Sequence, residues 1–145
     1  MGIQNIHQVI LEEESAEPVQ PDRLVGYEGK FITFDAKDGR SFIFSFRGAR
    51  SHPDLSNRFF MTHEYRAERL ELPQDGIDHF GRPMGGGRIM IDNENILLFG
   101  TSDTFGGYSK ERVIPFLEKW ATEYLPKHRI PNNFTVSADS KVIFL

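Results

Sequence analysis

The chain has 145 residues, a formal net charge of −4 and no cysteine. This length favours a single domain with its own hydrophobic core, and the lack of cysteine excludes disulfides, thiolate nucleophiles and cysteine-ligated zinc. The slight acidity gives no overall positive field of the kind that draws a protein to nucleic acid, so we expect no nucleic acid partner.

The first 25 residues carry little structural pattern. One short apolar run, "VIL", precedes an acidic segment with two prolines, a composition typical of an exposed loop. We expect a single domain over residues 1–145, with a mobile extension over 1–25 and a compact core over 26–145. The chain start does not resemble a signal peptide, and no apolar run is long enough to span a membrane. We therefore expect a cytoplasmic monomer without a membrane partner.

Two alternating apolar runs, 30–35 and 41–46, flank the turn sequence "KDG" and predict a β-hairpin. The polar residues 47–57 are expected to form a loop. Residues 58–62 predict a short strand that ends at His63 and is followed by a helical turn, and one long strand fits the pattern as well.

A second hairpin is predicted farther along the chain. Residues 73–87 contain prolines and glycines and are expected to form a loop. The apolar runs 88–92 and 95–100 follow and predict two strands that turn at residues 93–94.

One strong helix is predicted from Ser109, a suitable N-cap, to Pro126. Its apolar residues recur at helical spacing along one stripe; they are Val113, Phe116, Leu117, Trp120, Tyr124 and Leu125. Residues 133–145 supply one or two closing strands. The pattern is that of an α+β domain, with a mixed, mostly antiparallel sheet of about six strands. The long helix flanks the sheet, together with a short helix if the residues after His63 are helical.

Glycines gather at both ends of the second hairpin. Gly85–Gly87 stand before Arg88, and two more glycines close the segment 101–107. Glycines let backbone N–H groups approach a ligand, and the start of the following helix favours an anion. Arg88 adds a planar cation suited to phosphate. The segment predicts an oxyanion-binding site, and close packing of the backbone is the structural alternative.

Histidine is the best candidate for an acid, base or nucleophile in a chain without cysteine. A zinc site from His63, Glu64 and His79 would lack any recognised ligand spacing. We therefore expect no metal ion and no cofactor.

The order of these parts resembles the protein histidine phosphatases of the Janus/Ocnus family. The matching parts are His63, "GGGRI" at 85–89, which begins 22 residues later, and "FGTSDTFG" at 99–106. "DAKDGRSFIFSF" and "NFTVSAD" are also similar, so the resemblance covers roughly residues 33–140. It implies a small α+β hydrolase that acts on phosphohistidine or related phosphoramidates without a metal ion.

The resemblance also implies roles for individual residues. His63 would be the catalytic histidine, as general base or as nucleophile. The phosphate-binding residues would be Arg88, Ser102, Asp103, Thr104, Phe105, Gly106 and Arg40. Arg40 is the nearest match to a basic residue on the first strand, and Lys30 is the alternative to it.

Asp103 stands where that family has an uncharged residue. Its carboxylate would repel a phosphate dianion unless it points away from the site. The expected partner is a phosphorylated protein or a small phosphoramidate substrate. The alternative is a non-catalytic binding or structural protein on the same fold that recognises a phosphorylated or acidic partner.

Overall fold

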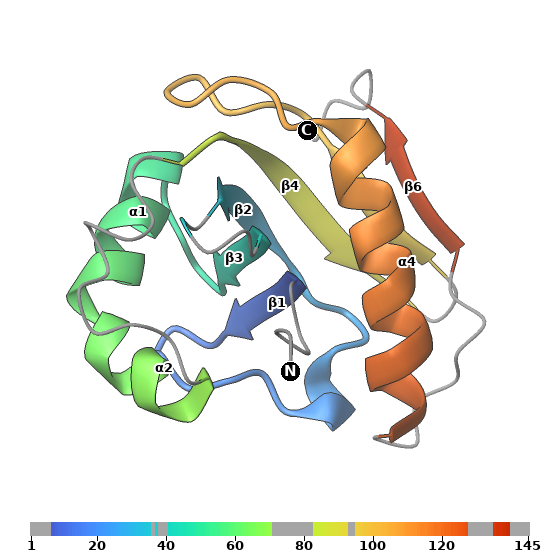
Figure 1. The fold of residues 1–145 in the computed structure, drawn as a ribbon, viewed down its shortest axis with the longest axis horizontal. Coiled ribbons are helices and arrows are strands. Elements are labelled where there is room, and N and C mark those ends of the chain that lie inside the picture. The colour runs from blue at the N-terminus through green and yellow to red at the C-terminus, as the bar shows by residue number, and fades with distance from the viewer. Residues whose placement is uncertain are drawn as a thin grey trace.

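A computed structural model describes residues 7–35, 37, 41–70, 83–92, 95–127 and 135–139. Its elements are β1 (His7–Glu12), η1 (Pro21–Arg23), β2 (Glu28–Asp35), β3 (Ser41–Phe46), α1 (His52–Met61), α2 (His63–Leu70), β4 (Gly85–Ile91), β5 (Asn95–Phe99), α4 (Lys110–Lys127) and β6 (Thr135–Asp139). Within this part of the chain, six strands form one sheet in the order β1-β3-β2-β4-β5-β6. Helices α1 and α2 lie on one side of the sheet and α4 on the other (Figure 1).

Both predicted hairpins are confirmed. Strand β2 pairs antiparallel with β3, and β4 pairs antiparallel with β5. The two hairpins join through an antiparallel pairing of β2 with β4. Strands β1 and β6 add to the two edges in parallel. The domain is therefore α+β, with a mixed and mostly antiparallel sheet, as the sequence predicted.

Side chains of the sheet alternate between two hydrophobic clusters, because successive residues of a strand point to opposite faces. Phe31 of β2 and Ile89 of β4 pack on the face covered by α4, with Leu117. Ile32 of β2 packs on the other face, with Phe59 of α1. Each strand therefore contributes to two different environments, one under α4 and one under α1 and α2.

The long helix follows its predicted stripe where the side chains are described. Val113 and Leu117 are buried, Trp120 packs partly buried against the same cluster, and Glu118 and Lys119 are exposed. The helix extends to Lys127, one residue past the predicted end. The side chains of Phe116, Tyr124 and Leu125 lie outside the described part of the chain. None of the described helices is long and apolar enough to cross a membrane.

Leu117→Ala is expected to lower the free energy of unfolding by about 2–5 kcal/mol, because the substitution leaves a cavity in the core. Leu117 has no exposed surface. Urea unfolding followed by circular dichroism measures the change. Lys119→Ala, on the exposed face of the same helix, should change the free energy by no more than about 0.5 kcal/mol. Equal effects of the two substitutions would contradict the packing of α4 described above.

The segment from residue 47 to 62 differs from its prediction as a loop followed by a short strand. Residues 52–61 form α1 instead. The Ser51 side chain caps this helix by accepting a hydrogen bond from Asp54 N at 3.1 Å, and Pro53 fits the first turn. Capping at the start of the segment thus outweighs the strand propensity of "RFF". The helix expected after His63 is confirmed as α2.

The N-terminal segment also differs from its prediction as an extension beside the core. Strand β1 pairs with β3 and forms one edge of the sheet. Val19 and Leu24 are buried in the cluster under α4. The division expected at residue 25 is therefore wrong for the described residues from 7 onward, which belong to the same folded unit.

Candidate functional site

The three consecutive glycines are the first residues of β4, where the sequence had predicted a loop. A methyl group added at Gly85 would overlap the backbone of Gly107, and one added at Gly87 would overlap the carbonyl of Phe99. Close packing, the structural alternative for these glycines, is therefore present. Because these glycines have no side chain, the segment that connects β5 to α4 packs directly against the start of β4.

His52, the first residue of α1, lies against this glycine strand. Its Nε2–H donates to the carbonyl oxygen of Gly87 at 3.0 Å, and a methyl group at Gly86 would contact its ring. A carbonyl oxygen only accepts hydrogen bonds, so in the neutral ring Nε2 carries the proton and Nδ1 the lone pair. His52 is 9% exposed. The fold therefore holds a nearly buried imidazole at the triple glycine.

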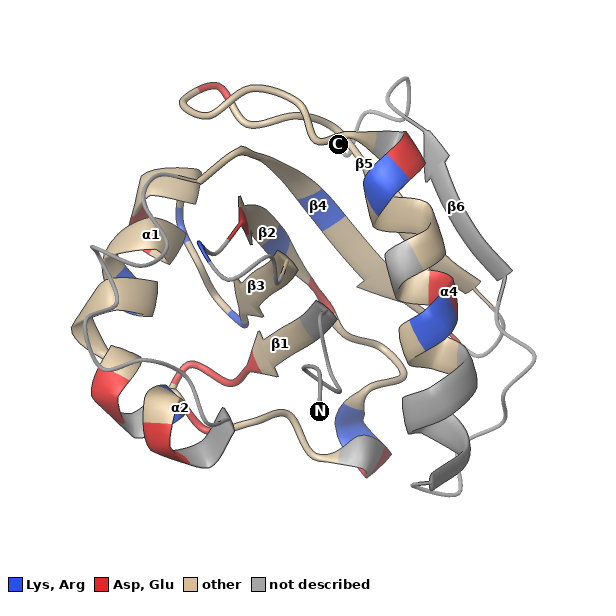
Figure 2. Cartoon of the chain, viewed as in Figure 1, with Lys and Arg blue, Asp and Glu red and all other residues tan. Residues whose placement is uncertain are grey.

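The charges around His52 come from three other elements. Lys30 on β2 lies opposite Arg88 on β4 in the antiparallel register, and Asp103 lies in the loop after β5. Figure 2 shows basic residues on β2 and β4 and an acidic residue near the tip of this loop. The loop extends across the end of the sheet at which β4 begins (Figure 1).

Burial and the neighbouring charges shift the pKa values of His52 and Lys30. Burial lowers the pKa of His52 below its ordinary value, while the hydrogen bond to the Gly87 carbonyl raises it. Lys30 and Arg88 also lower the pKa of His52, and Asp103 raises it. Burial also lowers the pKa of Lys30, with Arg88 acting in the same direction and Asp103 against it. The imidazole is therefore neutral at pH 7. The Asp103 carboxylate lies close enough to act on both His52 and Lys30.

Hydrogen bonds between its own residues hold the loop after β5 in a tight turn. Ser102 N–H donates to the Gly106 carbonyl at 3.2 Å, Gly106 N–H donates back at 2.9 Å, and Ser102 Oγ accepts from Phe105 N–H at 3.0 Å. Gly106 has a φ of 85°, which favours glycine. Within the described part of the chain, the amides of Asp103 and Thr104 have no acceptor, and both residues are exposed. Of the amides predicted to bind phosphate, these two remain available to a ligand.

The structure describes two of the three basic residues that were considered for the site. Arg88 lies on β4, with Nη1 3.9 Å from Glu28 Oε1, and its side chain is 35% exposed. Arg40 lies outside the described residues. Lys30, named as the alternative to Arg40, lies in the group around His52. Among the side chains that the structure describes, no group of three His, Asp or Glu could hold a metal ion.

His63 lies at the junction of α1 and α2 and not at the end of a strand. It is 4% exposed, and its ring centroid is 6.0 Å from that of Phe59. From His52 to Met61, α1 rises about 14 Å at 1.5 Å per residue. His63 therefore lies at the other end of α1 from the histidine that contacts the glycine strand. Its catalytic role stays a prediction, and the group of charges at the glycines is built around His52.

A local signal for His52 was present in the sequence. Ser51 and Asp54 have the spacing of a capping box, and Pro53 between them suits the first turn of a helix. This pattern predicts a helix that starts at His52. It does not say which strand lies beside that helix end.

No known protein-family model matches the chain. Over 54 residues, the chain is 43% identical to the sex-regulated protein janus-B of Drosophila sechellia and to the protein of the same name from Drosophila simulans. Each match covers 36% of this chain and 37% of the relative, so the chain matches these curated relatives over about a third of their length. The comparisons support a Janus-like relationship over this part of the chain.

Proposed function

We propose that the protein is a hydrolase that removes phosphoryl groups from phosphohistidine or related phosphoramidates without a metal ion. The main support for the proposal is one arrangement of residues. A neutral, nearly buried His52 on α1 contacts the glycine strand, beside two basic side chains and two amides that are available to an anion. The resemblance to the Janus/Ocnus family supplies the reaction class.

A phosphoryl group on nitrogen leaves readily once that nitrogen is protonated, so the protein has mainly to position the group and stabilise its oxygens. Lys30, Arg88 and the amides of Asp103 and Thr104 would bind the phosphoryl oxygens. His52 would use the lone pair on Nδ1 either to attack phosphorus or to take a proton from the attacking water.

The assay is hydrolysis of phosphoramidate, followed by phosphate release, with and without a chelator. We expect hydrolysis in both cases and amide shifts at Asp103 and Thr104 when inorganic phosphate is added. Absence of hydrolysis would overturn the proposal, whether or not the amides shift.

The effect of Asp103 on His52 and Lys30 favours a second candidate, a non-catalytic protein that binds a phosphorylated or acidic partner. The carboxylate offsets part of the positive charge that a phosphoryl transfer would use. Amide shifts with phosphate but no hydrolysis would support this candidate.

Asp103→Asn is expected to raise the affinity for inorganic phosphate about three- to tenfold at low salt, because it removes a negative charge from the site. The affinity is measured from amide shifts during a phosphate titration. Glu118→Gln, an exposed position on α4, removes the same charge far from the site and should leave the affinity unchanged. Equal affinities of the wild type and Asp103→Asn would show that the carboxylate does not face the anion.

The pH dependence follows from the lowered pKa of His52. We expect kcat/KM to fall at acid pH with a midpoint below about 6.5, because protonation removes the lone pair. Asp103→Asn should move this midpoint lower, since Asp103 raises the pKa of His52. As the pH falls below about 6.5, the unfolded state binds the proton first, so the free energy of unfolding should decrease down to the folded-state pKa. A midpoint above 6.5 would contradict this assignment.

A further inference from the structure

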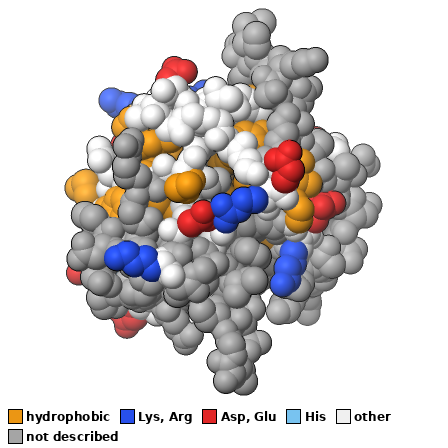
Figure 3. All heavy atoms as spheres, turned by 45° about the horizontal axis from the view of Figure 1, so that its top comes forward, with side chains coloured by type: hydrophobic (Ala, Val, Ile, Leu, Met, Phe, Trp, Pro, Cys, Tyr) orange, Lys and Arg blue, Asp and Glu red, His pale blue; other side chains and the backbone are white. Residues whose placement is uncertain are grey.

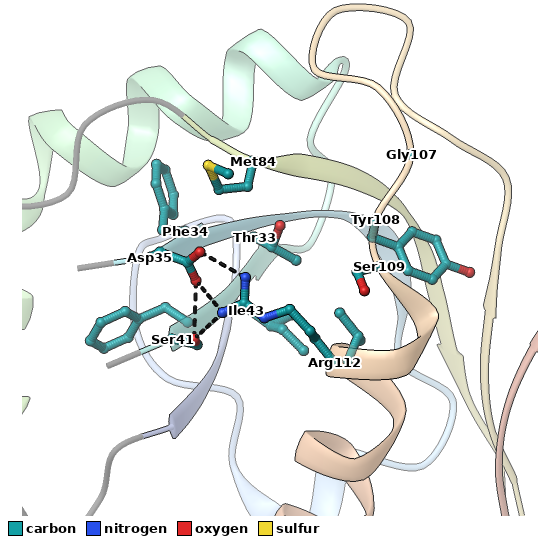
Figure 4. Close-up of a pocket in the computed structure, with 12 residues that line it drawn as sticks. Thr33, Phe34, Asp35, Ser41, Ile43, Met84, Gly107, Tyr108, Ser109 and Arg112 are labelled. Carbon is teal, nitrogen blue, oxygen red and sulfur yellow. Dashed lines mark hydrogen bonds and ion pairs between the residues drawn. The ribbon is translucent and has the colours of Figure 1, made fainter. Parts of the chain in front are cut away.

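A cavity of about 480 Å³ opens on the α4 side of the sheet, beside the start of β4. Its apolar lining includes Ile43 of β3, Met84 just before β4, Tyr108 and Val113 of α4. Figure 4 shows side chains from β2, β3 and α4 around this space, with Met84 on the far side from Arg112. A volume in this range is typical of sites for small ligands.

The charged groups at the cavity neutralise each other. Arg112 donates to both carboxylate oxygens of Asp35 at 2.8 Å and to Ser41 Oγ at 3.0 Å. The hydrogen bonds from Arg112 hold the pKa of Asp35 below its usual range. In the view of Figure 3, hydrophobic side chains lie exposed around a pair of opposite charges. The two charged side chains that line the cavity are paired with each other, so its apolar wall is better suited to an uncharged group than to an ion.

The cavity adjoins the candidate phosphoryl site through two segments. Met84 lines the cavity and stands two positions before Gly86, which lies against His52. Two residues of a strand span about 7 Å. Gly107 also lines the cavity and follows Gly106, whose carbonyl accepts from Gly86 N–H at 3.1 Å. A peptide with its phosphorylated residue at His52 would therefore place a residue about two positions away beside Met84.

We propose that this cavity binds an apolar side chain of a polypeptide substrate, about two residues from the phosphorylated residue. The inference rests on the proposed function. It means that the protein recognises its substrate on both sides of the glycine strand: phosphoryl oxygens on the α1 side and an apolar side chain on the α4 side. A small phosphoramidate would use the first site alone.

The experiment uses three pentapeptides with phosphohistidine at the centre and glycine elsewhere, two of them with leucine at the first or the last position. One of the leucine peptides should have a kcat/KM about tenfold above that of the all-glycine peptide, from burial of the side chain. Met84→Gln should reduce this advantage to about twofold, since it makes one wall polar without changing the charge. Hydrolysis of phosphoramidate itself should not change.

Met61→Gln is the matched control. Met61 is 81% exposed at the end of α1 away from His52, and Met84 is 60% exposed at the cavity. The control variant should hydrolyse all substrates like the wild type. Equal kcat/KM for the three peptides, or a leucine preference that Met84→Gln leaves intact, would overturn the inference while phosphoramidate hydrolysis upheld the proposed function.

A binding measurement distinguishes failure of the proposed function from failure of the proposed peptide site. The unphosphorylated leucine peptide should shift the amides of Ile43, Ser109 and Val113 in the wild type and less in Met84→Gln. If no phosphoramidate is hydrolysed, the proposed function fails. Shifts at these amides would then uphold the cavity as a peptide site, and their absence would overturn it.

Discussion

Replacing His52 by alanine is expected to lower kcat/KM for phosphoramidate hydrolysis by about 10²–10⁴-fold, the contribution of a general base, or by more if the ring is the nucleophile. The ring is neutral, nearly buried and held against Gly87. Phosphate binding should survive, because Lys30, Arg88 and the loop amides do not depend on the ring. Steady-state rates and a phosphate titration of the same variant measure the two effects.

Two further variants make this result decisive. His52→Gln keeps a side-chain N–H that could donate to Gly87 but removes the basic nitrogen, so it should fold like the wild type and lose the same activity. His63→Gln should keep activity within a few-fold if His52 is catalytic. A large loss in His63→Gln with an active His52→Gln would assign the chemistry to His63 instead. Circular dichroism and thermal unfolding check that each variant is folded.

The second large effect concerns a buried ion pair. Arg66 on α2 and Glu12 at the end of β1 are each 1% exposed, with Nε and Nη2 of Arg66 3.1 and 3.0 Å from the two carboxylate oxygens. Arg66 also donates to the Phe59 carbonyl and to Thr62 Oγ1, both at 2.8 Å. Its guanidinium lies 4.7 Å from the centre of the Phe44 ring. The pair thus joins the edge strand of the sheet to both α1 and α2.

Glu12→Ala is expected to lower the free energy of unfolding by about 3–5 kcal/mol, because it leaves the Arg66 guanidinium buried without its counter-ion. Replacing both residues, as Glu12→Leu with Arg66→Met, should cost less than Glu12→Ala alone, since no buried charge remains. Arg23→Gln removes a surface pair with Glu13 and should cost no more than about 1 kcal/mol. A loss below about 1 kcal/mol in Glu12→Ala would contradict the structural role of the pair.

Local patterns were enough to predict the two hairpins and α4. Alternation on both sides of "KDG" specifies β2 and β3, and the apolar stripe with Ser109 at its start specifies α4, because these signals depend on neighbours in the sequence. The signal for the start of α1 was equally local, but residues 47–57 were predicted as a loop and residues 58–62 as a strand. The glycines and Arg88 could also be assigned to one end of the sheet, since a hairpin brings its own ends together.

Only the tertiary structure shows which histidine contacts the glycines and that Glu12 is buried. A spacing of 22 residues before the first glycine pointed to His63. That histidine follows the C-terminal end of α1, which lies about 14 Å along the helix axis from its start at His52. From the sequence, Glu12 is expected to begin an exposed acidic segment. It is buried instead, because β1 pairs with β3 and Arg66 of α2 forms an ion pair with it. Distance along the chain does not measure distance in space once a helix packs across a sheet, so the local sequence determines the elements and their packing determines the site.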